Sequence, residues 1–354
     1  MIFERLRNDG LPTIPLNDIQ IKYKKQVEEK IKNKHYQFET IQCIICNSEL
    51  FETISEKDKH GLLFYVSICK NCGLVQTNPR MTKSSYDEFY NEEYRPLNTG
   101  KAKATESFFH DQYIQGEVIY SLLTATLNKK ITKKFVLEIG PGAGGILEYF
   151  KNKGNIVTGL DIGKEYIEFG KQKGLDLRVG TVKDIGVYSQ KPDIVIYSYV
   201  LEHVRDPIKE LVELRKFLHK DSVVYIQVPN IKRYETIFHN QDLQDYFQIA
   251  HLYHFSEISL RNCVRKAGFD FIGGNQIIQV LCRMEQVSND FENEYKEMLT
   301  FFENLEKSRI NPPMSVILKK KFYYPINKIL RRFETLMIIS KKIYYGYLIL
   351  RKKL

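Results

Sequence analysis

The stretch "FVLEIGPGAGG", residues 135–145, constrains the fold of this 354-residue chain more than any other feature. A short apolar run enters a loop in which Gly140, Gly142, Gly144 and Gly145 crowd together. Such a loop lets the backbone approach a ligand closely. Read as Gly140-x-Gly142-x-x-Gly145, it fits the dinucleotide-binding fingerprint. Read from Glu138 through Gly140, Gly142 and Gly144, it fits a second class of nucleoside-binding loop, and the loop alone leaves both interpretations open.

The sequence after residue 134 repeats the order strand, loop, helix. Short apolar runs predict strands at 135–139, 155–160, 176–179, 193–198 and 222–228. Amphipathic spacing predicts helices near 144–153, 163–173, 206–219 and 256–267. Alternating strands and helices indicate an α/β fold with a parallel sheet covered on both faces. The segments "FDFIGG" and "QIIQVLCRME" predict two further strands that close one edge.

Two carboxylates accompany the glycine loop. Glu138 lies two residues before the first glycine, where its carboxylate can reach the amino end of a bound nucleoside derivative. Asp161 ends the next strand, "NIVTGLD", where a carboxylate can bind both hydroxyls of a ribose. Both interpretations of the loop survive this comparison, since a ribose is common to both.

The fourth strand separates the two interpretations. "DIVIYSYVLEHVRDP" (193–207) and "AHLYHFSEISLRNCVRKAGFD" (250–270) resemble the class I S-adenosylmethionine-dependent methyltransferases, and the resemblance covers about residues 134–285. It implies a Rossmann-like, seven-stranded methyltransferase sheet with S-adenosylmethionine as cofactor. The chain departs from the common pattern at Glu138, where aspartate is more frequent, and at Pro141 within the loop. The resemblance implies these cofactor-binding residues: Glu138, Gly140, Gly142, Gly144, Asp161, Ile162, Val182 and Ser198.

Four cysteines ahead of this region have the spacing of a metal site. Cys43-x2-Cys46 and Cys69-x2-Cys72 supply four sulfur ligands suited to tetrahedral Zn²⁺. Four sulfurs close the coordination shell, so such a zinc ion organises the fold and does not activate water. Two redox-active cysteine pairs are the alternative. Cys263 and Cys282 lack this spacing and are expected to be core residues.

The cysteine module narrows the resemblance to zinc-ribbon methyltransferases of sugar and surface-glycan (polysaccharide) biosynthesis, some of which methylate carbon. That resemblance implies a sugar or glycan substrate between the ribbon and the core. It makes Tyr94, His203 and His251 candidate catalytic residues, whereas His254 is expected to pack in the core. The carbon-methylating relatives typically carry glutamate where this chain has Ala250, which favours an oxygen or nitrogen acceptor.

These patterns divide the chain into five expected parts. They are an N-terminal extension (1–40), a zinc-ribbon module (41–80), a helical linker or active-site lid (81–130), the methyltransferase core (131–285) and a helical, basic, amphipathic C-terminal region (286–354). Within the last part, Phe291, Tyr295, Met298, Phe302 and Leu305 follow helical spacing.

The net charge of +10 is concentrated in residues 315–354, which hold 11 Lys or Arg and one acid. Their helical stripe of apolar residues predicts peripheral contact with an anionic membrane face, and a helix packed on its own domain is the alternative. The ribbon holds four bases and four acids, which disfavours nucleic acid. With no signal peptide or spanning segment in the sequence, a cytoplasmic location is expected. A zinc-ribbon RNA methyltransferase and a non-catalytic binding module remain the alternative functions.

Overall fold

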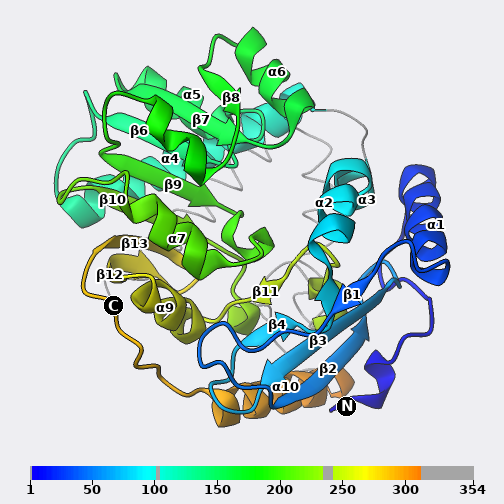
Figure 1. Cartoon of the computed structure of the whole chain (residues 1–354). Coiled ribbons are helices and arrows are strands. Elements are labelled where there is room, and N and C mark those ends of the chain that lie inside the picture. The colour runs from blue at the N-terminus through cyan, green and yellow to red at the C-terminus, as the bar shows by residue number, and fades with distance from the viewer. Residues whose placement is uncertain (1, 101–103, 234–241, 312–354) are drawn as a thin grey trace.

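The computed structural model describes residues 2–100, 104–233 and 242–311, and it contains two larger β-sheets (Figure 1). A seven-stranded sheet lies on one side of the molecule and a four-stranded sheet on the other. The seven strands are β6 (Phe135–Ile139), β7 (Ile156–Asp161), β8 (Leu177–Val179), β9 (Ile194–Ser198), β10 (Val223–Gln227), β12 (Phe269–Asn275) and β13 (Gln279–Met284).

The larger sheet has the order β12-β13-β10-β9-β6-β7-β8. Its five strands from β10 to β8 are parallel, and β13 and β12 join antiparallel at one edge. The chain runs from β6 outward to β7 and β8 and then returns to the other side of β6 as β9. This reversal creates a topological switch point between β6 and β9, where ligands bind in sheets of this kind. The fold is therefore the expected Rossmann-like α/β fold.

Alternate residues of each central strand enter different hydrophobic cores. Val136 and Ile194 pack with one cluster, whereas their neighbours Leu137 and Val195 pack with the other. Apolar residues on both faces explain why the strands read as continuous apolar runs. Helices α4 (Glu106–Leu127), α5 (Gly145–Asn152) and α6 (Lys164–Gln172) cover one face, and α7 (Pro207–Arg215) and α9 (Glu257–Lys266) cover the other.

The smaller sheet contains most of the ribbon and one strand from the core region. Its order is β11-β4-β3-β2, all antiparallel, made of β2 (Phe51–Lys57), β3 (Leu63–Cys69), β4 (Val75–Thr77) and β11 (Tyr253–His254). A separate two-stranded sheet pairs β1 (Phe38–Glu39) with β5 (Arg80–Met81). Because β11 lies between β10 and α9 in the sequence, the ribbon sheet is completed by a segment of the expected core.

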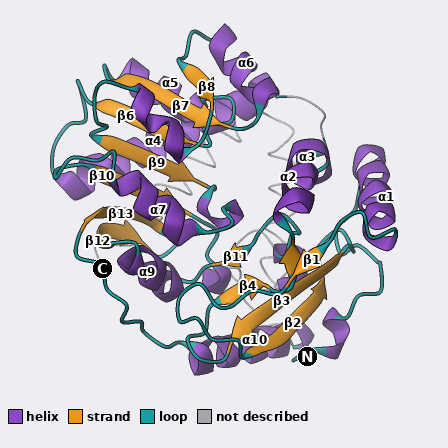
Figure 2. Cartoon of the chain, viewed as in Figure 1, coloured by secondary structure: helices purple, strands orange, loops and turns teal. Residues whose placement is uncertain are grey.

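Helices surround the smaller sheet (Figure 2). They are α1 (Asp18–Lys32), α2 (Lys83–Glu92), α3 (Tyr94–Thr99), α8 (Leu243–Tyr246) and α10 (Tyr295–Ile310). Short 3-10 helices occur at Glu4–Leu6, at Val182–Val187 after β8, at Leu201–His203 after β9 and at Ile231–Arg233 after β10. One hydrophobic core connects Val66 of the ribbon, Phe247 and Phe302 with Leu137 of the larger sheet. The ribbon and one face of the larger sheet are thus stabilised together.

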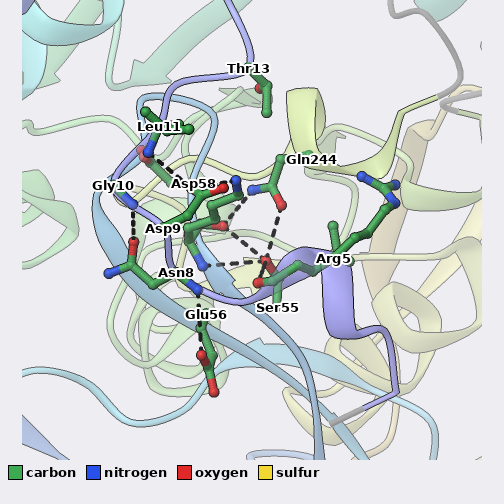
Figure 3. Close-up of polar contacts among 12 residues, drawn as sticks. Arg5, Asn8, Asp9, Gly10, Leu11, Thr13, Ser55, Glu56, Asp58 and Gln244 are labelled. Atoms are coloured by element: carbon green, nitrogen blue, oxygen red, sulfur yellow. Dashed lines mark hydrogen bonds and ion pairs between the residues drawn. The ribbon is translucent and has the colours of Figure 1, made fainter.

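The N-terminal segment, the ribbon strand β2 and the segment around α8 contact one another (Figure 3). Gln244 of α8 reaches Ser55 of β2, and its Nε2 donates to the carbonyl oxygen of Lys57 at 2.6 Å. The Lys57 ammonium pairs with Asp9 at 2.7 Å. Arg5 pairs with Asp242 at 2.8 Å. The extension is therefore held to the ribbon and to the segment after β10 by directional contacts.

The predicted strands and helices of the larger sheet are confirmed. The ends of the five parallel strands agree within one residue, whereas β13 begins three residues later and α7 ends four residues earlier than expected. Two expectations about other segments are wrong. Strand β2 was not predicted, and Phe291 lies before α10 and is 36% exposed. The predicted membrane-contacting helix falls in 312–354, outside the described residues. Within the described ranges, no helix combines the length and the apolar character that crossing a membrane requires.

Candidate active site

The glycine loop lies at the carboxyl end of β6, beside the switch point. Gly140 and Gly142 have φ values of +71° and +54°, a left-handed conformation that favours glycine. A Cβ atom on Gly140 would lie 2.5 Å from Cγ2 of Val200, too close for any larger residue. Gln112 of α4 holds the loop from outside, because its Nε2 donates to the carbonyl oxygen of Pro141 at 2.8 Å. The loop is therefore fixed in shape by its neighbours.

The two candidate carboxylates face this loop. Oδ2 of Asp161 accepts from the backbone N–H of Gly142 at 2.9 Å, and Oδ1 accepts from Gly163 at 2.7 Å. Glu138 is 1% exposed, and its Oε2 has no hydrogen-bond partner among the described residues. Burial, with the nearby charge of Asp161, raises the pKa of Glu138 well above its usual value. A buried carboxyl oxygen without a partner fits the amino group of a bound S-adenosylmethionine.

The other predicted cofactor residues follow the ends of neighbouring strands. Gly144 is the N-cap of α5, Ile162 follows β7 and is 46% exposed, Val182 begins the 3-10 helix after β8 and is buried, and Ser198 ends β9. Because the strands are parallel, these positions share one edge of the sheet. The predicted set is thus brought together around the switch point.

Two segments meet next to the end of β9. The 3-10 helix Leu201–His203 follows β9, and the turn before β11 carries His251. The backbone N–H of Leu252 donates to the carbonyl oxygen of Glu202 at 2.8 Å. Tyr86 of α2 donates through its hydroxyl to the carbonyl oxygen of Ala250 at 2.8 Å. These contacts hold Glu202, His203 and His251 as one group, called the histidine cluster below.

Geometry fixes the tautomer of His203. Its Nδ1 lies 2.9 Å from the carbonyl oxygen of Ala250. A carbonyl can only accept, so Nδ1 carries a proton and Nε2 keeps its lone pair when the ring is neutral. Burial lowers the pKa of His203 to about 4, despite the hydrogen bond to Ala250. His203 is therefore neutral near pH 7, with a basic nitrogen available.

Three polar groups of the histidine cluster have no hydrogen-bond partner among the described residues. They are both carboxyl oxygens of Glu202 and Nδ1 of His251. Glu202 is 1% and His251 5% exposed, and burial raises the pKa of Glu202 to about 8. Burial lowers the pKa of His251 well below its usual value. Buried polar groups are nearly always paired, so the cluster indicates a site that receives another group.

Aromatic side chains of α2 and α3 pack against the histidine cluster. The rings of Tyr94 and His203 lie 5.3 Å apart, and Tyr90 stacks on Tyr94 at 4.6 Å. The Arg95 guanidinium lies over Tyr166, at the start of α6, with 4.6 Å to its ring centre. The structure thus brings Tyr94, His203 and His251 together, as the sequence predicted. Sequence reasoning assigned no role to Glu202, although it lies in the quoted segment 193–207, and none to Tyr90 or Arg95, which lie close to the predicted Tyr94.

The four predicted zinc ligands form a second cluster, called the cysteine cluster below. The Sγ atoms of Cys43 and Cys72 are 3.4 Å apart, and those of Cys46 and Cys69 are 3.5 Å apart. All four Sγ atoms lie within 4.8 Å of one another. Sulfur ligands at 2.3 Å from a tetrahedral zinc lie about 3.8 Å apart, so the cluster could hold this ion. Close contacts across the two pairs fit one four-sulfur site better than two separate redox pairs.

Turn geometry presents these sulfurs. Asn47 follows the first pair with φ +58°, and Gly73 follows the second with φ +85°. Their backbone N–H groups donate to the carbonyl oxygens of Cys43 at 2.8 Å and of Cys69 at 2.9 Å. Each pair therefore sits on a tight turn, which the asparagine and glycine in the sequence favour.

Comparisons with known proteins agree with this arrangement. Residues 110–272 match the model of a family described as a methyltransferase domain. The ubiquinone biosynthesis O-methyltransferase of Haemophilus ducreyi is 31% identical over 108 residues, 27% of this chain and 46% of its own length. That of Histophilus somni is 32% identical over 111 residues, 28% of this chain and 47% of its own length. The chain spans about half the length of these curated relatives.

One comparison with a solved structure has low sequence identity. Magnesium protoporphyrin IX methyltransferase from Synechocystis PCC 6803, with bound SAH, aligns with a TM-score of 0.40 at 15% identity. The alignment covers 58% of this chain and 100% of that one.

Proposed function

We propose that this protein, whose residues 110–272 match a methyltransferase domain, transfers the methyl group of S-adenosylmethionine to a hydroxyl of a sugar-containing acceptor. The switch point between β6 and β9 carries the proposal, because the glycine loop and the histidine cluster meet there. Bound S-adenosylmethionine supplies an electrophilic methyl group. Methyl transfer is an in-line displacement, so holding the two reactants in line can supply much of the acceleration.

The cofactor half of the site contains complementary groups. Glu138 offers a buried carboxyl oxygen without a partner for the cofactor's amino group. Asp161 has two acceptor positions already used by Gly142 and Gly163 and keeps further lone pairs for the ribose hydroxyls. The backbone contacts fix the Asp161 carboxylate before the cofactor arrives. This part of the proposal needs no rearrangement of the loop.

The acceptor half favours a group that loses a proton. A hydroxyl must be deprotonated as it attacks, and the neutral imidazole of His203 has a free Nε2 next to the acceptor region. Ala250, in place of the glutamate of carbon-methylating proteins, favours an oxygen or nitrogen acceptor over carbon. The curated relatives named above are O-methyltransferases, which supports oxygen. An amine acceptor is the nearest alternative, because a neutral amine needs no strong base.

The sugar rests on the resemblance of the cysteine-containing module to zinc-ribbon enzymes of glycan biosynthesis. The same module on an RNA methyltransferase would be expected to carry an excess of basic residues. Here it carries four basic and four acidic residues, which supports a small or glycan acceptor over RNA. A non-catalytic module would keep the glycine loop but would have no need for the histidine cluster.

Cofactor binding is tested by Asp161→Ala. Losing a charged hydrogen-bond acceptor costs about 1.5–3 kcal/mol, which corresponds to roughly 10- to 100-fold weaker binding of S-adenosylmethionine. Calorimetry measures this effect. Asp176→Ala is the control, because this exposed carboxylate lies just before β8 and contacts Thr158 and Arg178 instead. Equal affinity in wild type and Asp161→Ala would reject the cofactor assignment.

The acceptor is tested with radiolabelled methyl transfer to four groups of compounds: nucleotide-sugars, lipid-linked glycans, ubiquinone precursors and RNA. We expect label only in a sugar-containing acceptor, released by conditions that cleave methyl ethers and not by those that cleave esters. Label in a ubiquinone precursor or in RNA would replace the sugar proposal. Cofactor binding without label in any group would favour the non-catalytic alternative.

A further inference from the structure

We infer that Glu202, His203 and His251 bind a divalent transition-metal ion that receives the hydroxyl of the acceptor. This inference deepens the proposed function and rests on it for the role of the ion, although the metal site itself does not. The site is distinct from the cysteine cluster. It has two nitrogen ligands and one carboxylate, whereas the cysteine cluster has four sulfurs.

Proximity is the first observation. One ligand atom from each of the three residues lies within 4.8 Å of the others, and His203 Nε2 and Glu202 Oε1 are 3.9 Å apart. Nitrogen and oxygen ligands at about 2.1 Å from a tetrahedral ion lie about 3.4 Å apart. The pair therefore needs to close by roughly 0.5 Å, which a small rotation of the Glu202 carboxyl provides.

Unused lone pairs are the second observation. Both carboxyl oxygens of Glu202 and Nδ1 of His251 are buried without a hydrogen bond among the described residues. Leaving one buried polar group unpaired costs about 1–3 kcal/mol, and here a carboxyl group and an imidazole nitrogen are unpaired in one place. A cation at their centre would pair all of them at once. Within the described part of the chain, no Lys or Arg side chain forms an ion pair with Glu202.

Orientation of the imidazoles is the third observation. His203 donates Nδ1–H to the carbonyl oxygen of Ala250, which leaves the Nε2 lone pair on the side of Glu202. The side-chain amide of Gln248 contacts Nε2 of His251, and its Oε1 has no partner among the described residues. With the amide turned so that Oε1 accepts from Nε2–H, Nδ1 of His251 keeps its lone pair for the ion. Metal-binding histidines typically have such a second hydrogen bond, which fixes the tautomer and ring orientation. Both rings of this cluster have one.

The ligand set predicts the kind of ion and its role. Two imidazoles and a carboxylate suit Zn²⁺ and neighbouring transition metals, and three protein ligands leave a position open. An acceptor hydroxyl bound there would release its proton to water more readily. With the ion bound, Nε2 of His203 would act as a ligand and would no longer be the base that accepts this proton. Its oxygen then bonds to the methyl carbon while the carbon–sulfur bond breaks and the electron pair stays on sulfur. The products are the methyl ether, S-adenosylhomocysteine and one proton.

Metal stoichiometry and cobalt spectroscopy on the full-length chain test the site. Saturation with Co²⁺ alone should give two equivalents per chain. One should show the intense sulfur-to-cobalt charge-transfer bands of a thiolate site, and the other only the weak bands of nitrogen and oxygen ligands. Titration of the zinc-loaded ribbon with Zn²⁺ by calorimetry should likewise show one further equivalent. A single, thiolate-type equivalent would overturn the inference.

Variants assign the second equivalent. Glu202→Gln and His251→Gln should each lose it, or weaken it at least 100-fold, while keeping the thiolate-type equivalent as proof that the ribbon is folded. His254→Phe is the matched control, because His254 is equally buried and close to His251 but outside the ligand group. It should keep both equivalents. A second equivalent that persists in Glu202→Gln and His251→Gln would reject the assignment.

S-adenosylmethionine affinity, measured on the same samples, separates this inference from the proposed function. A second metal equivalent without cofactor binding would reject methyl transfer and keep the metal site. Cofactor binding and methyl transfer with only one metal equivalent per chain would reject the metal site and keep the proposed function.

Discussion

The cysteine cluster and the histidine cluster border the same hydrophobic core, yet the chain assembles them in different ways. Each cysteine pair lies within one tight turn, so its spacing is visible in the sequence. The histidine cluster joins Glu202 and His203, at the end of β9, to His251, which precedes β11. Its geometry exists only when the two segments are folded against each other.

Strand β4 connects the two clusters. It begins three residues after Cys72, and at its other end Thr77 donates through Oγ1 to the carbonyl oxygen of His251 at 2.6 Å. The backbone N–H of Thr77 donates to the carbonyl oxygen of Leu252 at 2.9 Å. By contrast, the glycine loop is held by Gln112 and Asp161, which lie outside the ribbon. The comparison implies that the ribbon orders the acceptor half of the site and leaves the cofactor half independent.

The largest effect is expected from removing the ribbon zinc. Zinc binding contributes about 10–16 kcal/mol to the folding of small zinc-finger peptides, so Cys69→Ser should cost this protein several kcal/mol. Because the ribbon shares its core with one face of the larger sheet, the loss should extend beyond residues 41–80. Zinc content, thermal unfolding and limited proteolysis measure the change.

Cys263→Ala provides the control for this variant, since Cys263 is fully buried in α9 and outside the cysteine cluster. It should keep its zinc and lose only about 1–2 kcal/mol for the small cavity. Normal zinc content and normal protease resistance in Cys69→Ser would show that the cysteine cluster does not organise the ribbon.

Much of the larger sheet could be predicted from the sequence, because its signals are local. Strands β6, β7 and β9 are apolar runs that lead through turns to the amphipathic helices α5, α6 and α7, and the glycine loop marks the first crossing. Strand β2 was missed because its sequence, "FETISEK", mixes charged and apolar residues. Strand β11 has only two residues, and its pairing with β4 depends on tertiary contact. No local sequence pattern predicts a strand that is this short.

The candidate site likewise contains residues that the sequence identifies and residues that only the folded structure reveals. The cysteine spacing and the carboxylates around the glycine loop could be read directly. The importance of Glu202 could not, because a glutamate beside a histidine is usually exposed, and only the fold reveals that it is buried without a partner. Gln112 carried no signal either, since it lies on a helix that precedes the motif by many residues.

An intermediate effect is expected where β4 meets the histidine cluster. Thr77→Val removes the hydroxyl that donates to the carbonyl oxygen of His251 and leaves that buried oxygen with one bond fewer. Stability should fall by about 1–3 kcal/mol. A small displacement of His251 should slow methyl transfer by roughly tenfold, because misplacement of about 1 Å can cost 100-fold. Cofactor affinity should stay unchanged. Chemical unfolding, calorimetry and initial rates measure these three quantities.

Ser67→Ala is matched to this change, because buried Ser67 also donates to a carbonyl oxygen, that of Asn78 at 3.0 Å, but within the ribbon. The free energy of unfolding of Ser67→Ala should fall by a comparable amount, while its rate of methyl transfer should equal that of the wild type. If both variants slowed the reaction equally, the loss would reflect general destabilisation, and the connection through β4 would be rejected.

The smallest effect is expected from the hydroxyl of Tyr94. Burial, opposed in part by the charge of Arg95, raises the pKa of Tyr94 to about 12, so the phenol stays protonated near pH 7. Its hydroxyl is engaged with Asn98, whereas its ring lies against His203 and Tyr90. Tyr94→Phe keeps the ring and should change kcat/KM by less than about threefold, under roughly 0.7 kcal/mol.

Tyr94→Ala removes the ring that covers His203 and should lower kcat/KM at least about tenfold, comparable to losing an aromatic contact. A loss of two orders of magnitude in Tyr94→Phe, with unchanged cofactor affinity, would instead make the hydroxyl a catalytic group and move the acceptor's proton transfer away from the histidine cluster.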